Sequence, residues 1–176
     1  DGAWTPAPQG LGVWESWGVP ALADFNGMVW FETTATLTAA QAKGAASLEI
    51  GMVDEVDTTY VNGVGVGSTS GAGTVRVYPV SAGTLKAGAN RIVVSALDTY
   101  ANGGMYGDAA RALVLADGTR IPLTAWRYQI EPKATGEPPR APWDTLSGVS
   151  TLYNGMLAPM GPYAFKGFAW YQGESN

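Results

Sequence analysis

The residues with the clearest chemical potential lie in the last ten positions, where an apolar run leads into a polar turn. Residues 167–171 are Gly-Phe-Ala-Trp-Tyr, a pattern typical of a fully buried strand. Gln172, Gly173 and Asn176 follow it and supply two amide donors and a backbone that another atom can approach closely. Ester hydrolysis passes through an oxyanion that needs two or three N–H donors directed at one point. The turn therefore suits an oxyanion site, or else its polar groups only satisfy the end of a buried strand.

Glu174 belongs to the same turn and has two equal interpretations. It could orient a neighbouring catalytic group, or it could be a surface carboxylate. A buried parallel strand presents functional groups at its carboxyl end, which is the usual arrangement in α/β folds. We therefore expect residues 149–176 to belong to an α/β domain.

The composition excludes several kinds of catalysis within these 176 residues. The sequence contains no Cys, which excludes disulfides, thiol catalysis and Cys-ligated zinc. It contains no His either, so a Ser-His or Cys-His pair cannot be completed inside the chain. No residue pattern calls for a cofactor or a catalytic metal, and neither is expected.

Charge and hydropathy exclude two classes of partner. The net charge is −5, with only 10 Lys and Arg residues. Because a nucleic-acid surface needs a basic stripe, we expect no nucleic-acid partner. No apolar stretch approaches the ~18 residues that a membrane span requires, so we expect no membrane partner.

Asp54, Glu55 and Asp57 form a second group that could do chemistry. Hard cations such as calcium take several oxygen ligands. Three acids are few for that purpose, however, and alternation along a strand would point them to opposite faces. The preferred interpretation is that they cap a turn.

Trp4, Trp14 and Trp17 lie in an N-terminal segment rich in Gly and Pro. Their rings could stack on sugars, but packing against a β-sandwich or another domain is the preferred interpretation. Residues 102–104, Asn-Gly-Gly, are expected to form a flexible loop, which is the usual place for a binding surface.

Short β-strands are the elements expected to position these residues. The 24 Gly and 11 Pro are scattered, which argues against a helical bundle and fits strands joined by tight turns. Runs that are β-branched and aromatic, or that alternate with period two, predict strands. They occupy residues 29–37, 47–53, 58–67, 75–80, 91–97, 112–115, 119–123 and 126–130. One helical turn is expected within residues 38–44.

Turn signals join these runs into hairpins. Asn62-Gly63 tolerates the positive φ angles of a type I′ turn, and Asp117-Gly118 marks a second hairpin. Pro79 indicates a strand edge or end, because proline cannot donate to a ladder. Seven or eight short strands over about 100 residues predict a mostly β fold, an antiparallel β-sandwich.

The chain is expected to divide into four parts. An N-terminal segment covers residues 1–20 and the β-sandwich covers residues 21–132. Four prolines between Glu131 and Trp143 predict a linker at residues 133–148. Residues 149–176 then form the fragment of an α/β domain.

Two motifs near the C-terminus resemble a known family: L-Y-N-G-M-L-A-P-M at 152–160 and G-F-A-W-Y-Q-G-E-S-N at 167–176. They closely resemble the middle of bacterial sialate O-acetylesterases and related carbohydrate acetylesterases of the SGNH-hydrolase superfamily. The region before them resembles the jelly-roll, galactose-binding-like sandwich intercalated in that family's catalytic domain, and family 2 glycoside hydrolases carry a similar domain. The motifs behind this second likeness are F-N-G-M-V-W-F (25–31), D-E-V-D-T-T-Y-V-N-G-V-G-V-G (54–67), R-V-Y-P-V (76–80), L-K-A-G-A-N-R-I-V-V (85–94) and L-T-A-W-R-Y (123–128).

The resemblance implies serine-dependent removal of acetyl groups from sugars. The partners would be an acetylated carbohydrate and the remainder of the catalytic domain. The family's Gly-x-Ser-type nucleophile precedes the sandwich and its His follows the W-Y-Q-G-E-S segment, so both would lie outside this chain. The resemblance assigns the side-chain oxyanion donor to Gln172 or Asn176 and a backbone donor to Gly155. It also implies a secreted or periplasmic bacterial protein.

A non-catalytic module is the alternative, either a carbohydrate-binding domain or a structural spacer. The discriminating feature is the C-terminal motif, because a self-contained binding module has no use for W-Y-Q-G-E-S-N.

Overall fold

The computed structural model describes residues 3–107, 110–132, 158–160 and 167. The chain divides into two compact units, Asp1–Pro139 and Arg140–Asn176. The described part of the second unit consists of Gly167 and one short 3₁₀ helix, η5 (Ala158–Met160). The strands described below all belong to the first unit.

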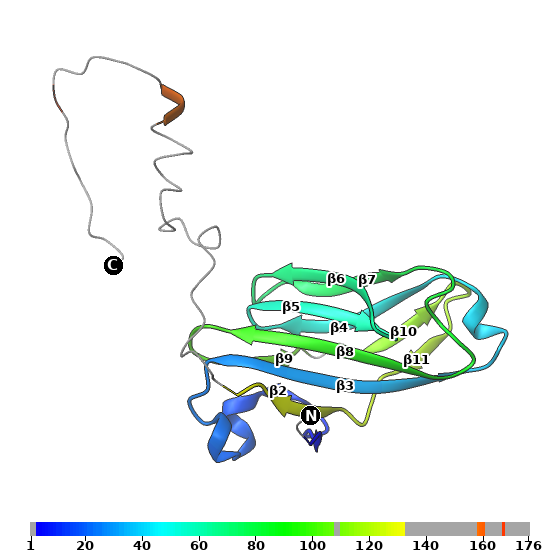
Figure 1. Ribbon diagram of the computed structural model, residues 1–176, viewed down its shortest axis with the longest axis horizontal. Coiled ribbons are helices and arrows are strands. Elements are labelled where there is room, and N and C mark those ends of the chain that lie inside the picture. Colours follow the sequence, from blue (N-terminus) through cyan, green and yellow to red (C-terminus); the bar gives the residue numbers. More distant parts are fainter. Residues whose placement is uncertain (1–2, 108–109, 133–157, 161–166, 168–176) are drawn as a thin grey trace. The chain divides into compact units, whose positions relative to one another are not determined.

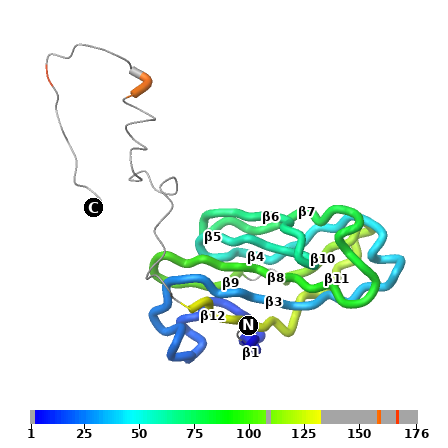
Figure 2. Tube along the Cα trace, viewed as in Figure 1, coloured from blue at the N-terminus to red at the C-terminus, as the bar shows by residue number. Residues whose placement is uncertain are grey.

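Six antiparallel strands form the first sheet of the sandwich (Figure 1; Figure 2 labels β1 and β12). The longest pair, β3 with β8, lies at its centre and keeps an unbroken register from Gly27↔Asp98 to Leu37↔Gly88. In spatial order the strands are β1 (Thr5–Pro6), β12 (Arg127–Ile130), β3 (Gly27–Leu37), β8 (Gly88–Asp98), β5 (Val56–Val61) and β6 (Val64–Ser70).

The second sheet is built around β4 (Ala46–Val53), which carries strands on both of its edges. On one edge it pairs with β7 (Val75–Val80). On the other edge its first half pairs with β10 (Ala112–Leu115) and its end pairs with β9 (Gly104–Tyr106). The outer strands are β11 (Arg120–Pro122), beside β10, and β2 (Gly12–Val13), beside β9.

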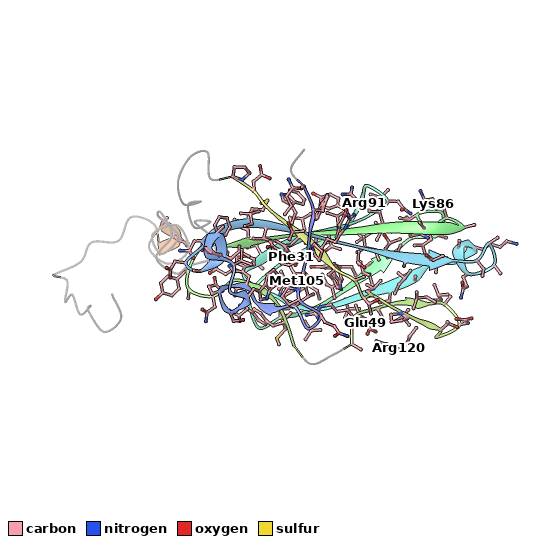
Figure 3. All side chains as sticks on the ribbon, turned by 90° about the horizontal axis from the view of Figure 1, so that it is seen from below. Phe31, Glu49, Lys86, Arg91, Met105 and Arg120 are labelled. Carbon is pink, nitrogen blue, oxygen red and sulfur yellow. The ribbon has the colours of Figure 1, made fainter. Side chains whose placement is uncertain are left out.

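Apolar side chains from both sheets fill the space between them. Along β3, Val29, Phe31 and Ala35 are buried at alternating positions, as expected for a strand with one face on a core. Phe31 from the first sheet and Met105 from the second are both fully buried, and Figure 3 shows them between the two layers. The fold is a mostly β, antiparallel β-sandwich, and the predicted fold class is confirmed for this unit.

The first 20 residues take part in both sheets. Residues Thr5 and Pro6 pair with β12, and Gly12 and Val13 pair with β9. The segment then continues into two short 3₁₀ helices, η1 (Trp14–Trp17) and η2 (Pro20–Leu22). Trp14 and Leu22 are fully buried, so the N-terminal segment contributes part of the hydrophobic core.

The predicted strands correspond closely to the observed ones, and the strand predictions at 75–80 and 112–115 have the observed bounds. Pro79 lies on β7, which pairs only with β4 among the described strands, so its placement on a sheet edge is confirmed. The expected helical turn is the 3₁₀ helix η3 (Gln41–Lys43). The two- and three-residue strands β1, β2 and β9 were not predicted. None of the described helices is long and apolar enough to cross a membrane.

The hairpin at Asn62-Gly63 has the predicted geometry. Asn62 and Gly63 have φ angles of 52° and 84°, the left-handed values that a type I′ turn requires. The Asn62 amide also donates to Asn90 Oδ1 at 2.8 Å and to the carbonyl of Thr84 at 2.9 Å. The hairpin is thereby fixed to the turn that precedes β8.

Gly63→Val is expected to lower the free energy of unfolding by about 1–3 kcal/mol, because a β-branched residue is strained at positive φ. No atom lies within 4 Å of a Cβ at this position, so the cost comes from the backbone and not from a clash. Urea denaturation measures it. The matched control is Gly73→Val, at a glycine with equally open surroundings and no positive φ. Equal effects of the two variants would contradict the assigned turn.

Candidate functional site

The predicted oxyanion residues lie outside the described residues, and their assignment stays a prediction. They are Gly155, Gln172, Gly173, Glu174 and Asn176. The same holds for the predicted strand at 167–171, of which only Gly167 is described. The candidate sites among the described residues therefore lie in the sandwich.

A buried ion pair connects the two sheets. Asp57 on β5 accepts a hydrogen bond from Nε of Arg76 on β7 at 2.9 Å, and both side chains are fully buried. The other guanidinium nitrogens of Arg76 donate to the carbonyls of Gly71, Thr74, Glu55 and Thr69. Every guanidinium nitrogen of Arg76 therefore has a hydrogen-bond partner within the protein. A buried charge is stable only when it is paired and hydrogen-bonded in this way.

Tyr78 extends this arrangement. Its hydroxyl lies 2.8 and 2.9 Å from the two carboxylate oxygens of Asp57 and 2.9 Å from Thr69 Oγ1. Burial raises the pKa of Tyr78 to about 12, so its hydroxyl is a donor at neutral pH. A Cβ at Gly67 would overlap the Tyr78 ring, which explains a glycine at that point of β6. These contacts hold the sheets together and leave no group free for chemistry.

The predicted acidic group Asp54, Glu55 and Asp57 does not converge on one point. Asp54 accepts from the Tyr106 hydroxyl at 2.6 Å, and Glu55 accepts from the backbone N–H of Thr99 at 2.7 Å. Asp57 is the buried partner of Arg76. In the described part of the chain, no group of three His, Cys, Asp or Glu residues could hold a metal ion. Glu55 therefore supports a turn, while Asp57 belongs to the core, a role that neither interpretation of these acids had considered.

Asp98, at the end of β8, is a fully buried carboxylate with one unpaired oxygen. Its Oδ1 accepts from the Tyr100 N–H at 2.8 Å, whereas Oδ2 has no hydrogen-bond partner in the described structure. Burial raises the pKa of Asp98 to about 6, and the nearby carboxylates of Asp54 and Glu15 add to the effect. The folded protein thus retains a proton that the unfolded chain releases near pH 4.

Asp98→Asn is expected to remove a loss of stability that the natural protein shows as the pH rises from about 4 to about 6. Between these values the unfolded state has lost the Asp98 proton and the folded state still holds it, so increasing pH favours unfolding; above about pH 6 the folded state also loses the proton and the dependence ends. Urea denaturation at several pH values tests this. Asp117→Asn is the control of opposite sign, since the Thr119 N–H lowers the pKa of Asp117. Parallel pH profiles for Asp98→Asn and the natural protein would contradict the prediction.

Two of the three N-terminal tryptophans are packing residues. Trp14 is fully buried, stacks on Phe31 at a centroid distance of 6.4 Å and meets Phe25 edge-on at 6.2 Å. Trp17 packs edge-on against Tyr128 at 5.1 Å and against Phe31 at 6.2 Å. The preferred interpretation is confirmed for both residues.

The flexible loop expected at residues 102–104 is a wrong prediction for its two glycines. Gly103 and Gly104 are buried, and Gly104 begins β9. The Gly103 carbonyl accepts from the backbone N–H of Trp14 at 3.0 Å, and the Gly103 N–H donates to Glu15 Oε1 at 3.1 Å. A Cβ on Gly103 would overlap the Trp14 ring. These glycines allow the N-terminal segment to approach the sheet, and Asn102 alone is exposed.

Trp4 differs from the other two tryptophans because it lies beside a groove on the outer face of the first sheet. Its ring is partly exposed, and the Arg91 guanidinium lies 5.6 Å from the ring centroid. Two adjoining hollows, of about 440 and 930 Å³, share Trp4 and Arg91 in their walls. We call them together the Trp4 groove. The smaller hollow is also lined by Glu32, Thr34, Lys86, Ala89 and Arg127.

Charged side chains from three neighbouring strands meet in this groove. Glu32 on β3 is 4% exposed, although it lies on the outer face, because two arginines cover it. Arg91 on β8 donates to Glu32 Oε2 from Nη2 at 2.6 Å and from Nε at 2.7 Å. Arg127 on β12 bonds to the other oxygen, Oε1. Sequence reasoning missed these residues, although charged side chains within otherwise apolar strands were a signal of them.

The groove can bind but has no apparatus for ester hydrolysis. Its cations and the Trp4 ring suit recognition of an anion and of an apolar face. Thr34 is the residue with a hydroxyl group among those that line the smaller hollow. The chain has no histidine that could act as a base and activate this hydroxyl as a nucleophile. Within the described residues, the groove therefore offers charged and aromatic groups but no nucleophile–base pair.

Comparison with known proteins gives two curated relatives. The sialate O-acetylesterases of Pongo abelii and Homo sapiens are each 40% identical to this chain over 69 residues. The matched part covers 36% of this chain and 13% of each relative, so the chain spans only a small part of their length. No family model matches the chain.

Among solved structures, the β-glucuronidase of Ruminococcus gnavus is 19% identical, with a TM-score of 0.43, over 66% of this chain and 22% of that chain. A family 2 β-galacturonidase from Eisenbergiella tayi is 22% identical, with a TM-score of 0.42, over 53% and 18%. In sequence, part of this chain is similar to a sialate O-acetylesterase.

Proposed function

We propose that this chain is part of a carbohydrate O-acetylesterase, which removes acetyl groups from sugars by serine ester hydrolysis. The observation that carries the proposal is the 40% identity over 69 residues to sialate O-acetylesterases. The likeness of residues 152–160 and 167–176 to the acetylesterase family supports it independently of the sandwich.

In this proposal the sandwich and the C-terminal segment have different roles. The sandwich is an intercalated module that carries no catalytic group. The C-terminal segment contributes to the acyl site: Gly155 donates a backbone N–H to the oxyanion, Gln172 or Asn176 donates from a side-chain amide, and Gly173 allows close approach. Glu174 orients a neighbouring group. Such donors stabilise the charge that develops on the carbonyl oxygen in the transition state.

The nucleophile and its base come from polypeptide outside these 176 residues. The absence of His from the chain requires this of the base, because a serine hydroxyl is weakly nucleophilic until a base removes its proton. The position of the nucleophile before the sandwich is what the family resemblance implies. The alternative, a non-catalytic carbohydrate-binding or structural module, requires no such partner, and this difference makes the two readings separable by experiment.

The test compares the parent polypeptide that contains this chain with the 176-residue chain alone. We expect the parent to release acetate from O-acetylated sialic acid or O-acetylated xylo-oligosaccharide, and a serine-directed inhibitor to stop the release. The chain alone, shown by circular dichroism to be folded, should not accelerate hydrolysis of p-nitrophenyl acetate, since it lacks a general base worth about 10²–10⁴ in rate.

Two results would overturn the proposal. A parent that releases no acetate from either sugar would favour the non-catalytic module. Saturable, inhibitor-sensitive turnover by the 176-residue chain alone would show that the nucleophile and base are not supplied from outside.

A further inference from the structure

We propose that the Trp4 groove binds a sugar that carries a carboxylate group. The inference deepens the proposed function by naming a class of carbohydrate and the surface that holds it, and it rests on that function for the choice of a sugar as ligand. The binding itself is a property of the sandwich and can be measured without any esterase activity.

The smaller hollow carries an excess of positive charge. Lys86, Arg91 and Arg127 face one carboxylate, that of Glu32, in a chain whose net charge is −5. Figure 3 shows Lys86 and Arg91 on the outer face of the first sheet, opposite the surface that carries Glu49 and Arg120. Cations gathered on one face of an acidic protein favour an anionic ligand there.

Hydrogen-bond donors in the groove remain available after the Glu32 carboxylate is satisfied. Arg91 and Arg127 have side chains 58% and 54% exposed, so their unused N–H groups face solvent. The Lys86 ammonium forms no ion pair in the described structure, and Lys86 is exposed. Arginine forks match the geometry of a carboxylate, and charge-assisted hydrogen bonds of this kind are stronger than neutral ones.

An apolar surface lies beside these donors. Trp4 leaves part of its ring exposed next to Arg91, and the larger hollow extends from it along Gln129, Ile130 and Glu131. A pyranose ring presents an apolar C–H face to such a ring, while its hydroxyl groups find an amide and a carboxylate as partners. Hollows of several hundred Å³ with a few convergent polar groups are typical of small-ligand sites.

The position of Glu131 favours a sugar over an acidic peptide as the ligand. Glu131 lies in the wall of the larger hollow, where its carboxylate accepts from Trp30 Nε1 at 3.1 Å. A peptide with several acidic residues would bring further negative charge against Glu131. A sugar with a single carboxylate places its charge among Lys86, Arg91 and Arg127 and only neutral hydroxyls near Glu131. The charge distribution therefore favours the acidic sugar.

The experiment is isothermal titration of the 176-residue chain with N-acetylneuraminic acid and with galacturonic acid, each of which has one carboxylate, and each compared with its methyl ester. Esterification removes the charge and keeps the sugar ring. We expect at least one acid to bind with an affinity about tenfold higher than that of its ester, since a hydrogen bond to a charged group is worth about one power of ten.

Variants locate the binding. Lys86→Gln and Trp4→Ala are each expected to weaken binding of the acid several-fold, while binding of the ester changes little with Lys86→Gln. Lys43→Gln is the matched control, because Lys43 is also an exposed lysine but lies on η3, outside the groove. Both lysine variants should retain the melting temperature of the natural protein.

Several results would overturn the inference: no binding of either acid at millimolar concentration, equal affinities for acid and ester, equal losses from Lys86→Gln and Lys43→Gln, or competition by a hexaglutamate peptide that binds more tightly than the sugar. Each is distinguishable from failure of the proposed function. If the parent polypeptide releases acetate and the chain binds no acidic sugar, only the present inference is wrong.

Discussion

Asp57→Ala is expected to lower the free energy of unfolding by about 3–5 kcal/mol, because it leaves the Arg76 guanidinium charged and without its anion inside the core. Asp57 and Arg76 are both fully buried, so water cannot replace the lost carboxylate. The same substitution also removes the acceptor of the Tyr78 hydroxyl and of Thr59 Oγ1. Urea denaturation followed by tryptophan fluorescence measures the loss.

Glu49→Ala provides the matched comparison. It breaks the Arg120–Glu49 pair, whose Nη2–Oε2 distance of 2.7 Å resembles that of the buried pair. The Arg120 side chain is 49% exposed, however, and an exposed pair contributes about 0–1 kcal/mol. A loss of less than 1 kcal/mol for Asp57→Ala, or equal losses for the two variants, would mean that Asp57 and Arg76 are not buried together.

A double variant separates the net contribution of the Asp57–Arg76 ion pair to stability from the cost of leaving the Arg76 charge buried without a partner. Asp57→Ala combined with Arg76→Met is expected to be more stable than Asp57→Ala alone, since no buried charge then remains. If the double variant is less stable than Asp57→Ala, so that Arg76→Met lowers the free energy of unfolding further, then the hydrogen bonds of Arg76 to the four carbonyls are what stabilises the fold.

Most of the sandwich could be predicted from the sequence because each long strand shows, within its own residues, which side chains face the core and which face solvent. In β3 and β8 every second residue faces the core, and this period is visible without knowledge of any partner strand. The hairpin at Asn62-Gly63 is equally local, since two adjacent residues must adopt positive φ. The strands β1, β2 and β9 have two or three residues, too few to show a period.

The orientation of β7 shows where local patterns fail. Alternation in the run V-R-V-Y-P-V would place Val75 and Val77 in the core, yet their exposed fractions are 59% and 53%. Arg76 and Tyr78 are buried instead, because Asp57 and four backbone carbonyls lie opposite them. The partner lies 19 residues away on another sheet, so no window of sequence along β7 contains the reason.

The Trp4 groove was missed for a related reason. Trp4, Glu32, Arg91 and Arg127 come from four strands or segments spread over most of the unit, and only the order β1-β12-β3-β8 brings them together. Among the tryptophans of the N-terminal segment, the sequence alone gives no basis for separating Trp4 from the buried Trp14. The pairing of β1 with β12 fixes the two residues that follow Trp4 at the edge of the first sheet, and Trp4 lines the groove beside Arg91.

Gln172→Ala in the parent polypeptide is expected to lower kcat for acetate release by about 10²–10³, with little change in KM, if Gln172 is the side-chain donor of the oxyanion site. The effect falls on kcat because the donor bonds more strongly to the oxyanion of the transition state than to the carbonyl oxygen of the bound ester. In that case Asn176→Ala has only a small effect on kcat. If Asn176 is the donor instead, Asn176→Ala shows the large loss of kcat and Gln172→Ala the small one. Initial rates over a range of acetylated-sugar concentrations separate kcat from KM.

The control for this pair is Gln9→Ala, which removes the same amide from an exposed position in the N-terminal segment. It should leave both kinetic constants unchanged. Loss of activity in Gln172→Ala with an unchanged melting temperature distinguishes an oxyanion donor from a residue that only satisfies the end of a strand, because a structural amide would lower stability and kcat together. If neither Gln172→Ala nor Asn176→Ala reduces kcat by tenfold, neither amide donates to the oxyanion. The stabilisation would then have to come from backbone N–H groups such as those of Gly155 and Gly173.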